Sequence, residues 1–246
     1  MTTLKTVAQQ YRELCLTGVA DHLDTLLAQA DASDCSYLQF AESLITLEQQ
    51  HRNAKRLQQN RKRAGFPVLK SLEEFDYRFQ TTISKREVNS LLDFHFIEQR
   101  QNLVFIGPPG VGKTHLATGI GLKAVEAGYK VCFHTALELM EILELAELKG
   151  ELKKKIAQLI KFDLLILDEL GYLPMNKRGM HNLFQLIHAF YEYRSLILTT
   201  NKEFTQWSEF FFDDNVAVPI VDRIIHHSHL FMLGGDSYRL KTKLNR

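Results

Sequence analysis

The hydrophobic positions of the chain change their spacing near residue 64. Before that point they recur at three- and four-residue steps, which is the period of an amphipathic helix. Three such stripes are present, through Leu4, Val7, Tyr11 and Leu14, then from Leu23 to Ala30, and then from Tyr37 to Leu57. Gly18 is expected to end the first helix. The spacing therefore predicts a small all-helical module whose apolar faces bury one another.

After residue 64 short apolar runs alternate with helical stretches. The runs are Leu103–Ile106, Val131–Phe133, Leu164–Leu167, Leu196–Leu198 and His229–Leu233. Thr135 and Glu138 form a capping-box pattern, which opens a helix between the second and third runs. Strands separated by helices are typical of an α/β fold, in which helices flank both faces of a central parallel sheet.

The segment AGFP, Ala64–Pro67, separates these two patterns. Proline lacks a backbone donor and restricts the residue before it, so the segment breaks the preceding helix. We therefore expect two domains, a helical one over residues 1–63 and an α/β one over residues 64–246.

Composition and charge exclude several classes of protein. Hydrophobic residues make up 45% of the 246 residues, charged residues 24%, and the net charge is +1. Any affinity for nucleic acid must therefore come from local clusters of charge. The three cysteines are far apart, the amino-terminal stretch lacks the apolar core of a signal peptide, and the apolar runs are too short to cross a bilayer. We expect a cytoplasmic protein with reduced thiols and no membrane segment.

The stretch GPPGVGKT fits the phosphate-binding pattern G-x-x-x-x-G-K-[ST]. Its members are Gly107, Pro108, Pro109, Gly110, Val111, Gly112, Lys113 and Thr114. An apolar run precedes the stretch and a helical pattern follows it, which is the context that a P-loop requires. Glycines let backbone N–H groups point at phosphate oxygens, the lysine reaches the outer phosphates, and the threonine hydroxyl reaches Mg²⁺. The alternative is a plain glycine turn between strand and helix.

Two acidic residues follow the third apolar run, in LLILDE. Asp168, at the end of a buried strand, is suited to the Mg²⁺ shell together with Thr114. Glu169 beside it can polarise a water for attack on the γ-phosphate. Thr199, Thr200 and Asn201 end the fourth run and would emerge beside the first two motifs if the strands are neighbours. Asn201 could then orient that water, although a turn or a helix cap would also explain an asparagine there. Two solvated acids at a strand end are the alternative for the acidic pair.

These motifs together resemble those of the AAA+ ATPases, and more closely those of the IstB family. Four further stretches carry the resemblance, namely AGFPVLKSLEEFDY, LLILDELGYLP, SLILTTNKEFTQW and VDRIIHHSHLFMLGGDSYRLK. It spans nearly the whole chain and is tighter from about residue 64 onward. It implies an ATPase that uses ATP and Mg²⁺, works as a homo-oligomer and assists the transposase of a bacterial insertion element. The short family members lack the full helical lid of larger AAA+ proteins.

The resemblance also implies roles for two arginines. Arg223 in VDRII occupies the position of an arginine finger, which reaches the γ-phosphate bound to a neighbouring subunit. A surface ion pair, for instance with Asp222, is the alternative. Arg239 matches a second arginine that senses the nucleotide. It could equally belong to a basic tail with Lys241, Lys243 and Arg246.

Basic residues gather between positions 51 and 63, in HRNAKRLQQNRKR. The cations are Arg52, Lys55, Arg56, Arg61, Lys62 and Arg63, with no acid among them. Such a run can contact several phosphates, although by itself it could equally be a solvated helix end. IstB-like proteins bind duplex DNA with little sequence preference, so the resemblance favours DNA binding. The sequence has no zinc-finger spacing and no recognition-helix pattern for reading bases.

Other functions remain as alternatives. A DnaC-like helicase loader would use the same ATPase site with a helicase as partner. A P-loop kinase would need an acceptor pocket and a mobile basic lid, which the sequence does not indicate. A scaffold that binds ATP without hydrolysing it would not need Glu169.

Overall fold

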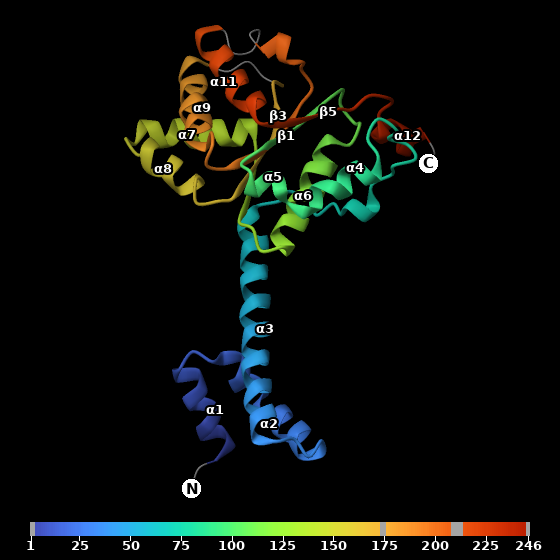
Figure 1. Ribbon diagram of the computed structural model, residues 1–246. Coiled ribbons are helices and arrows are strands. Elements are labelled where there is room, and N and C mark those ends of the chain that lie inside the picture. Colours follow the sequence, from blue (N-terminus) through green and yellow to red (C-terminus); the bar gives the residue numbers. More distant parts are fainter. Residues whose placement is uncertain (1–2, 173–175, 208–213, 245–246) are drawn as a thin grey trace. The chain divides into compact units, whose positions relative to one another are not determined.

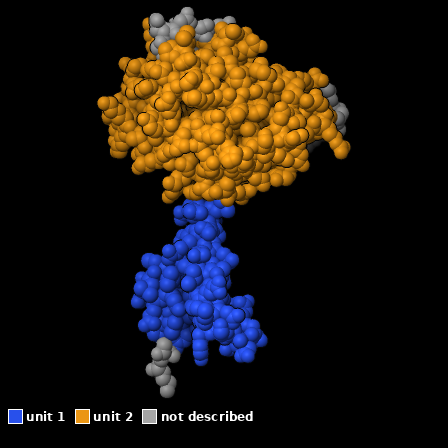
Figure 2. All heavy atoms as spheres, in the orientation of Figure 1, with its two compact units in different colours: residues 1–59 blue, residues 60–246 orange. Residues whose placement is uncertain are grey.

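The computed structural model describes residues 3–172, 176–207 and 214–244 (Figure 1). Two compact units are present, residues 1–59 and residues 60–246, which Figure 2 colours separately. Helix α3 (Tyr37–Ala64) ends where the AGFP segment was expected to break it. The division between the units lies near the end of that helix, a few residues before the expected domain boundary.

The first unit is helical, as expected, but its first helix boundary differs from the prediction. Helix α1 (Leu4–Glu13) ends before Cys15, whose left-handed φ of 60° turns the chain, and α2 spans Thr17–Ala32. The expected stop at Gly18 is therefore wrong. Gly18 is buried in the first turn of α2, and a Cβ there would lie 2.6 Å from the Cβ of His51. The glycine allows α2 and α3 to approach closely, which spacing along the sequence does not reveal.

The second unit is built on a sheet of five parallel strands, in the order β2-β3-β4-β1-β5. The strands are β1 (Asn102–Ile106), β2 (Val131–Thr135), β3 (Leu164–Leu170), β4 (Ser195–Thr200) and β5 (Ser228–Met232). All five expected runs are therefore strands. Strand β4 lies between β1 and β3, so the ends that carry the three sequence motifs are neighbours at one edge of the sheet.

Helices cover both faces of this sheet (Figure 1). The described helices of this unit are α4 (Lys85–Ser90), α5 (His95–Glu98), α6 (Lys113–Glu126), α7 (Ala136–Leu148), α8 (Leu152–Leu159), α9 (Lys177–Phe190), α11 (Asp214–His226) and α12 (Tyr238–Leu244), with short 3-10 turns η1 (Leu72–Glu74), η2 (Leu91–Asp93) and η3 (Phe204–Gln206). The predicted capping box is present, because the Thr135 hydroxyl accepts the N–H of Glu138 at 3.2 Å.

The alternation of strand side chains sorts the core into two layers. Leu165 and Leu167 of β3 are buried with residues of α7, α8, α9 and α11. Ile166 faces α6, where a Cβ on Gly121 would lie 2.5 Å from its Cδ1. Buried strands with helices on both sides are near-continuous apolar runs, which is why the sequence marks them clearly. Within the described ranges, no helix combines the length and the apolar character that crossing a membrane requires.

Candidate nucleotide site

The glycine-rich loop joins β1 to the start of α6, as the P-loop pattern predicts. Gly112 has a left-handed φ of 101° and precedes the first residue of the helix. A Cβ on Gly112 would lie 2.6 Å from Cε2 of Phe75, so the ring closes over the loop at a position that admits no side chain. The amino terminus of α6 and the loop N–H groups together favour an anion here.

Lys113 is buried and folded back onto the loop. Its Nζ donates to the carbonyl oxygens of Gly107 at 2.7 Å and of Pro108 at 2.8 Å. Burial lowers the pKa of this amine, and the carboxylate of Asp168 acts in the opposite direction. A phosphate would replace the carbonyls as the partner of the ammonium group and would favour its charged form.

A chain of hydrogen bonds joins the loop to the two neighbouring strands. The Thr114 hydroxyl donates to Oδ1 of Asp168 at 3.0 Å, and the Thr199 hydroxyl of β4 donates to the same oxygen at 2.5 Å. Asp168 is 3% exposed. A hydroxyl and a carboxylate beside a phosphate loop are the ligands that Mg²⁺ takes in proteins, with water and substrate phosphate completing its shell. The donor set of this site therefore fits Mg²⁺.

Glu169 is placed by an irregularity of β3. Consecutive strand residues point to opposite faces, but the register shifts between Leu167 and Leu170, and Glu169 has a left-handed φ of 63°. Its backbone N–H donates to the Thr199 hydroxyl at 2.9 Å. As a result Glu169 is exposed and lines the same pocket as Thr114, directly after the buried Asp168.

The fourth strand supplies Thr199 to this pocket, beside the first two motifs as expected for neighbouring strands. Thr199 is buried, lines the pocket and contacts both acidic residues. Asn201 directly follows the end of β4, and its buried Oδ1 accepts no hydrogen bond within the described part of the chain. Asn201 is not among the described residues that line the pocket. Thr199 therefore faces the pocket and Asn201, two residues further on, does not line it, a difference that only the folded structure shows.

One wall of the pocket comes from the segment before β1, which was not among the predicted site residues. The described lining residues from this segment are Lys70, Glu74, Phe75, Asp76, Phe79 and Gln80. Gln80, which is 4% exposed, donates to the carbonyls of Val111 at 3.0 Å and Gly234 at 3.1 Å. The aromatic residues of LEEFDYRF were the available signal, because a flat apolar wall suits a planar base.

Arg239 lies at the pocket, as the family resemblance implies. It belongs to α12, is exposed, and lines the pocket beside Tyr238. Its charge contributes to lowering the pKa of Lys113, after the larger effect of burial. Phe79 packs edge-on against the ring of Tyr238 with centroids 5.3 Å apart, so α12 is tied to the pocket wall. Arg246 and the side chain of Lys243 fall outside the described residues.

Arg223 lies at the amino ends of the strands, opposite the P-loop. It lines a small cavity with Asn102, the first residue of β1, whereas the P-loop follows the last residue of that strand. A five-residue strand is about 17 Å long, so Arg223 cannot reach the phosphates of its own chain. Its guanidinium lies over Phe184 at 5.2 Å, its Nη1 donates to the Pro219 carbonyl at 3.0 Å, and its buried Nε has no partner. Within the described residues it forms no ion pair with Asp222 or another acid.

The six basic residues predicted to bind DNA are all exposed. Arg52 has intramolecular partners, since its Nε donates to Glu48 Oε1 at 2.7 Å and its Nη2 to the Cys15 carbonyl at 3.0 Å. Lys55 and Arg56 lie in the first unit, whereas Arg61, Lys62 and Arg63 begin the second. Among the described residues no cluster of three or more His, Cys, Asp or Glu side chains could hold a metal ion.

Comparison with known proteins gives the family. A family model described as IstB-like ATP binding protein matches residues 9–246. The ATP-binding protein of insertion sequence IS5376 from Geobacillus stearothermophilus is 38% identical over 230 residues, covering 94% of this chain and 92% of the relative. The ATP-binding protein of insertion sequence IS21 from Pseudomonas aeruginosa is 40% identical over 222 residues, covering 90% and 84%.

Solved structures share the fold at lower identity. AMPPCP-bound DnaA from Aquifex aeolicus gives a TM-score of 0.56 at 22% identity, covering 74% of this chain and 56% of that chain. The DnaC helicase loader gives a TM-score of 0.50 at 24% identity, covering 59% and 85%. The second unit therefore has the AAA+ fold of these proteins. Sequence similarity over nine-tenths of its length shows that the chain belongs to the IstB-like ATP-binding proteins of insertion sequences.

Proposed function

We propose that this chain is an ATP-hydrolysing regulator that forms oligomers on duplex DNA and assists a transposase in DNA transposition. One observation carries the proposal. Thr114, Asp168 and Glu169 meet at the carboxyl ends of the strands, whereas Arg223 lies at the amino ends, and its buried Nε has no partner among the described residues. A second copy supplies Arg223 to the nucleotide of the first, so hydrolysis depends on assembly. The relatives named for insertion sequences favour a transposase as the partner.

The chain's own residues divide the work of the reaction. The loop N–H groups and Lys113 bind the phosphates, and the wall around Phe75 and Phe79 receives the base. Thr114 and Asp168 would hold Mg²⁺, which would neutralise phosphate charge. Glu169 orients a water in line with the γ-phosphate and polarises it, while Asn201 assists in its placement. Arg223 of the neighbouring copy stabilises the charge that develops on the phosphoryl oxygens.

Duplex DNA is bound through its phosphates. Lys55, Arg56, Arg61, Lys62 and Arg63 are exposed cations on one helix, and cation–phosphate contacts carry no base sequence. Binding is therefore largely independent of sequence and weakens with salt. ATP and chromosomal DNA are both found in the bacterial cytoplasm, where we place the activity.

Mixing two inactive variants tests the proposal. We expect Glu169→Gln to lower kcat by about two to four orders of magnitude because it removes the base. We expect Arg223→Ala to lower kcat by about three to five orders of magnitude because it removes the finger, with nucleotide binding retained in both variants. An equimolar mixture regains turnover at interfaces that pair an intact Glu169 with an intact Arg223, as measured by phosphate release.

The matched control is Arg86→Ala, which removes an exposed arginine on α4 outside the site. It should retain the turnover of the unaltered protein. A mixture that stays as inactive as its components, while both variants still bind ATP and oligomerise, contradicts action between subunits.

A helicase loader is the second candidate, since DnaC shares the fold. Both candidates use the same ATPase site and differ in the protein partner. Capture of the transposase by the ATP-bound protein supports our proposal. Capture of the replicative helicase alone, with both partners present at equal concentration, would reverse the order of the two candidates.

A further inference from the structure

A basic hollow lies away from the nucleotide pocket, in the second unit. It is formed where the last turns of α3, the start of β2 and the end of α8 meet. Its lining residues are Asn60, Arg63, Lys130, Val131, Gln158, Lys161 and Phe162, and its volume is about 580 Å³. Strand β2 runs from this hollow toward Thr135, which pairs with Asp168. The hollow therefore lies at the amino ends of the strands and the nucleotide pocket at their carboxyl ends.

The charge of the hollow is positive. Three of its lining residues are cations, and none of the lining residues is acidic. Arg63, Lys130 and Lys161 form no ion pair within the described part of the chain, in contrast to Lys154 of α8, which contacts Glu151 at 2.9 Å. Unpaired cations around a concave surface concentrate positive potential and attract an anion.

Asn60 gives the hollow a polar group that lacks a partner. It is 8% exposed, yet its side chain makes no hydrogen bond to any described residue. Its amide atoms are not among the fully buried polar groups that lack a partner, so water reaches them, and an acceptor oxygen of a ligand can take the place of that water. Its Nδ2 donor and the neighbouring amide of Gln158 are both suited to an acceptor oxygen.

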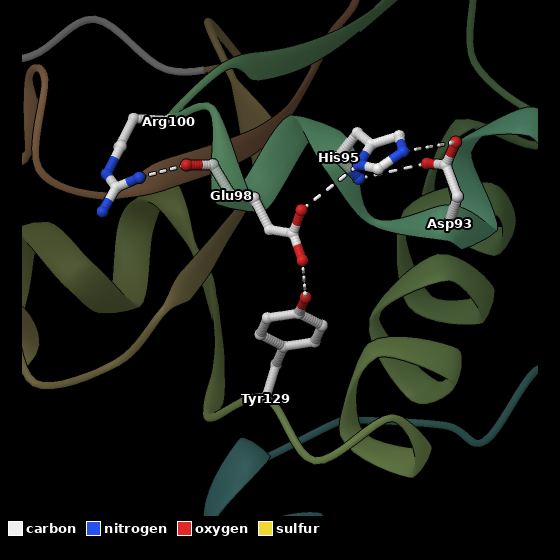
Figure 3. Close-up of polar contacts among 5 residues, drawn as sticks. All are labelled: Asp93, His95, Glu98, Arg100 and Tyr129. Atoms are coloured by element: carbon white, nitrogen blue, oxygen red, sulfur yellow. Dashed lines mark hydrogen bonds and ion pairs between the residues drawn. The ribbon is translucent and has the colours of Figure 1, made fainter.

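The backbone that carries Lys130 is held from two sides. Its N–H donates to Oδ2 of Asp163 at 2.9 Å. The preceding residue, Tyr129, donates its hydroxyl to Glu98 Oε1 at 3.4 Å, and Glu98 also contacts His95, as Figure 3 shows. Phe94 packs against the Tyr129 ring with centroids 5.4 Å apart. The hollow is therefore built on fixed elements, which lowers the entropy cost of binding.

We propose that this hollow binds a backbone phosphate of duplex DNA, with Lys130, Lys161 and Arg63 as cationic partners and Asn60 as a hydrogen-bond donor. The inference rests on the proposed DNA binding and extends its surface from α3 to β2 and α8. A phosphate oxygen matches both the unpaired cations and the amide of Asn60. Continuity with the exposed cations Arg61 and Lys62 of α3 favours the phosphates of a duplex over an isolated acidic side chain. The site positions the duplex without reading its bases.

The test uses the full-length protein with bound nucleotide and a labelled duplex of random sequence. Lys130→Gln/Lys161→Gln is compared with Lys5→Gln/Lys85→Gln, which removes two exposed lysines from α1 and α4. Affinity is measured by anisotropy at several salt concentrations. We expect the first variant to bind about tenfold more weakly, and its slope of log affinity against log salt to be shallower by about one to two units. The control variant should match the unaltered protein.

Asn60→Asp is the second variant, because it keeps the shape of the side chain and adds a negative charge. We expect it to weaken DNA binding at least as much as the double lysine variant, with an unchanged melting temperature and unchanged binding of a fluorescent ATP analogue. A competition arm with polyglutamate tests for an acidic protein as the ligand.

The outcomes separate this inference from the proposed function. If both hollow variants keep the affinity and salt slope of the unaltered protein, the hollow is not a DNA site, although DNA binding by α3 stands. If they lose affinity for polyglutamate alone, the ligand is an acidic protein and the inference is wrong. If the unaltered protein does not bind duplex DNA at all, the DNA-binding part of the proposed function fails together with the inference.

Discussion

At the scale of single residues, Thr199 is the side chain that connects the two acidic residues of the site. Its hydroxyl contacts the carboxylate of Asp168 and the backbone of Glu169, so one group fixes both positions. Glu169 has a left-handed conformation that is unfavourable for a residue with a side chain. The hydrogen bond to Thr199 compensates for part of that cost and aims Glu169 at the pocket.

We therefore expect Thr199→Val to separate binding from chemistry. Loss of the hydroxyl lets Glu169 relax, and a displacement of about 1 Å from the water can lower kcat by about 10²-fold. The KM for ATP should change little, since the phosphate loop is intact. Steady-state kinetics measure both values.

Thr199→Ser is the matched control, because it keeps the hydroxyl and should restore most of kcat. Equal kcat values for the valine variant and the unaltered protein would show that Thr199 does not position Glu169.

Lys113 makes nucleotide affinity depend on pH. Burial lowers its pKa in the free protein, and a bound triphosphate raises that pKa again. Affinity is therefore full below the lowered pKa of the free protein and falls as the pH rises through it. Titration with a non-hydrolysable ATP analogue between pH 7 and 10.5, alkaline enough to span a lowered lysine pKa, measures the effect.

The control for this prediction is Lys113→Arg, whose guanidinium does not titrate in that range. Provided that the arginine variant binds the analogue, its affinity should show a smaller decrease. A flat profile for the unaltered protein would contradict a role for the Lys113 charge in binding.

At the scale of elements, close contact between α2 and α3 organises the first unit. Glu48 of α3 is buried and accepts the N–H of Val19 at 3.2 Å and the guanidinium of Arg52. Burial alone would raise the pKa of Glu48, but these hydrogen bonds lower it. Gly18 allows this close approach of α3, because a side chain at that position would collide with His51.

Gly18→Ala should accordingly destabilise the first unit. The added Cβ overlaps the Cβ of His51, and overpacking of this kind costs about 1 to 3 kcal/mol. Thermal unfolding and amide exchange within residues 3–59 measure the loss. Gly234→Ala is the control, because its Cβ would meet Thr82 only at 3.7 Å. Equal amide protection in both variants would show that α2 and α3 are not in close contact.

Arg52 also changes how the basic segment should be tested. Neutralising Arg52 breaks its contact with Glu48 and leaves a buried carboxylate without its ion-pair partner. A loss of DNA affinity in such a variant could not be distinguished from a loss of folding stability. Lys55→Gln/Arg56→Gln avoids this problem. We expect weaker duplex binding with a shallower salt dependence, measured by anisotropy, and unchanged melting. An unchanged slope would place the DNA surface elsewhere.

The elements were more accessible from the sequence than their contacts. Apolar runs identify β1 to β5 because buried parallel strands are apolar on both faces, and the P-loop and Asp168 follow from local patterns. The position of Thr199 beside the first two motifs follows from the order of the strands, whereas its hydrogen bonds to Asp168 and Glu169 and the closing of Phe75 over Gly112 depend on partners distant in the sequence. The position of Gly18 was misjudged because its reason, the approach of His51, is also a long-range contact.

At the scale of the whole molecule, the separation of Arg223 from the P-loop leads us to expect that turnover depends on protein concentration. A single copy cannot place Arg223 at its own nucleotide, so ATP turnover per molecule should rise with protein concentration. Duplex DNA should increase turnover further, because several copies bind side by side on one DNA molecule. Phosphate release over a range of protein concentrations measures this dependence. Turnover strictly proportional to protein and indifferent to DNA would contradict it.

The wall of the nucleotide pocket has a consequence for communication along the chain. Phe75 closes over Gly112, and only the segment 65–71 separates the end of α3 from η1, where this wall begins. We therefore expect binding or release of a nucleotide base at this wall to be felt, through the short segment 65–71, at the end of the helix that carries the basic residues. The nucleotide state and the affinity for DNA would then be coupled through segment 65–71, and lengthening this segment with flexible residues should remove the coupling.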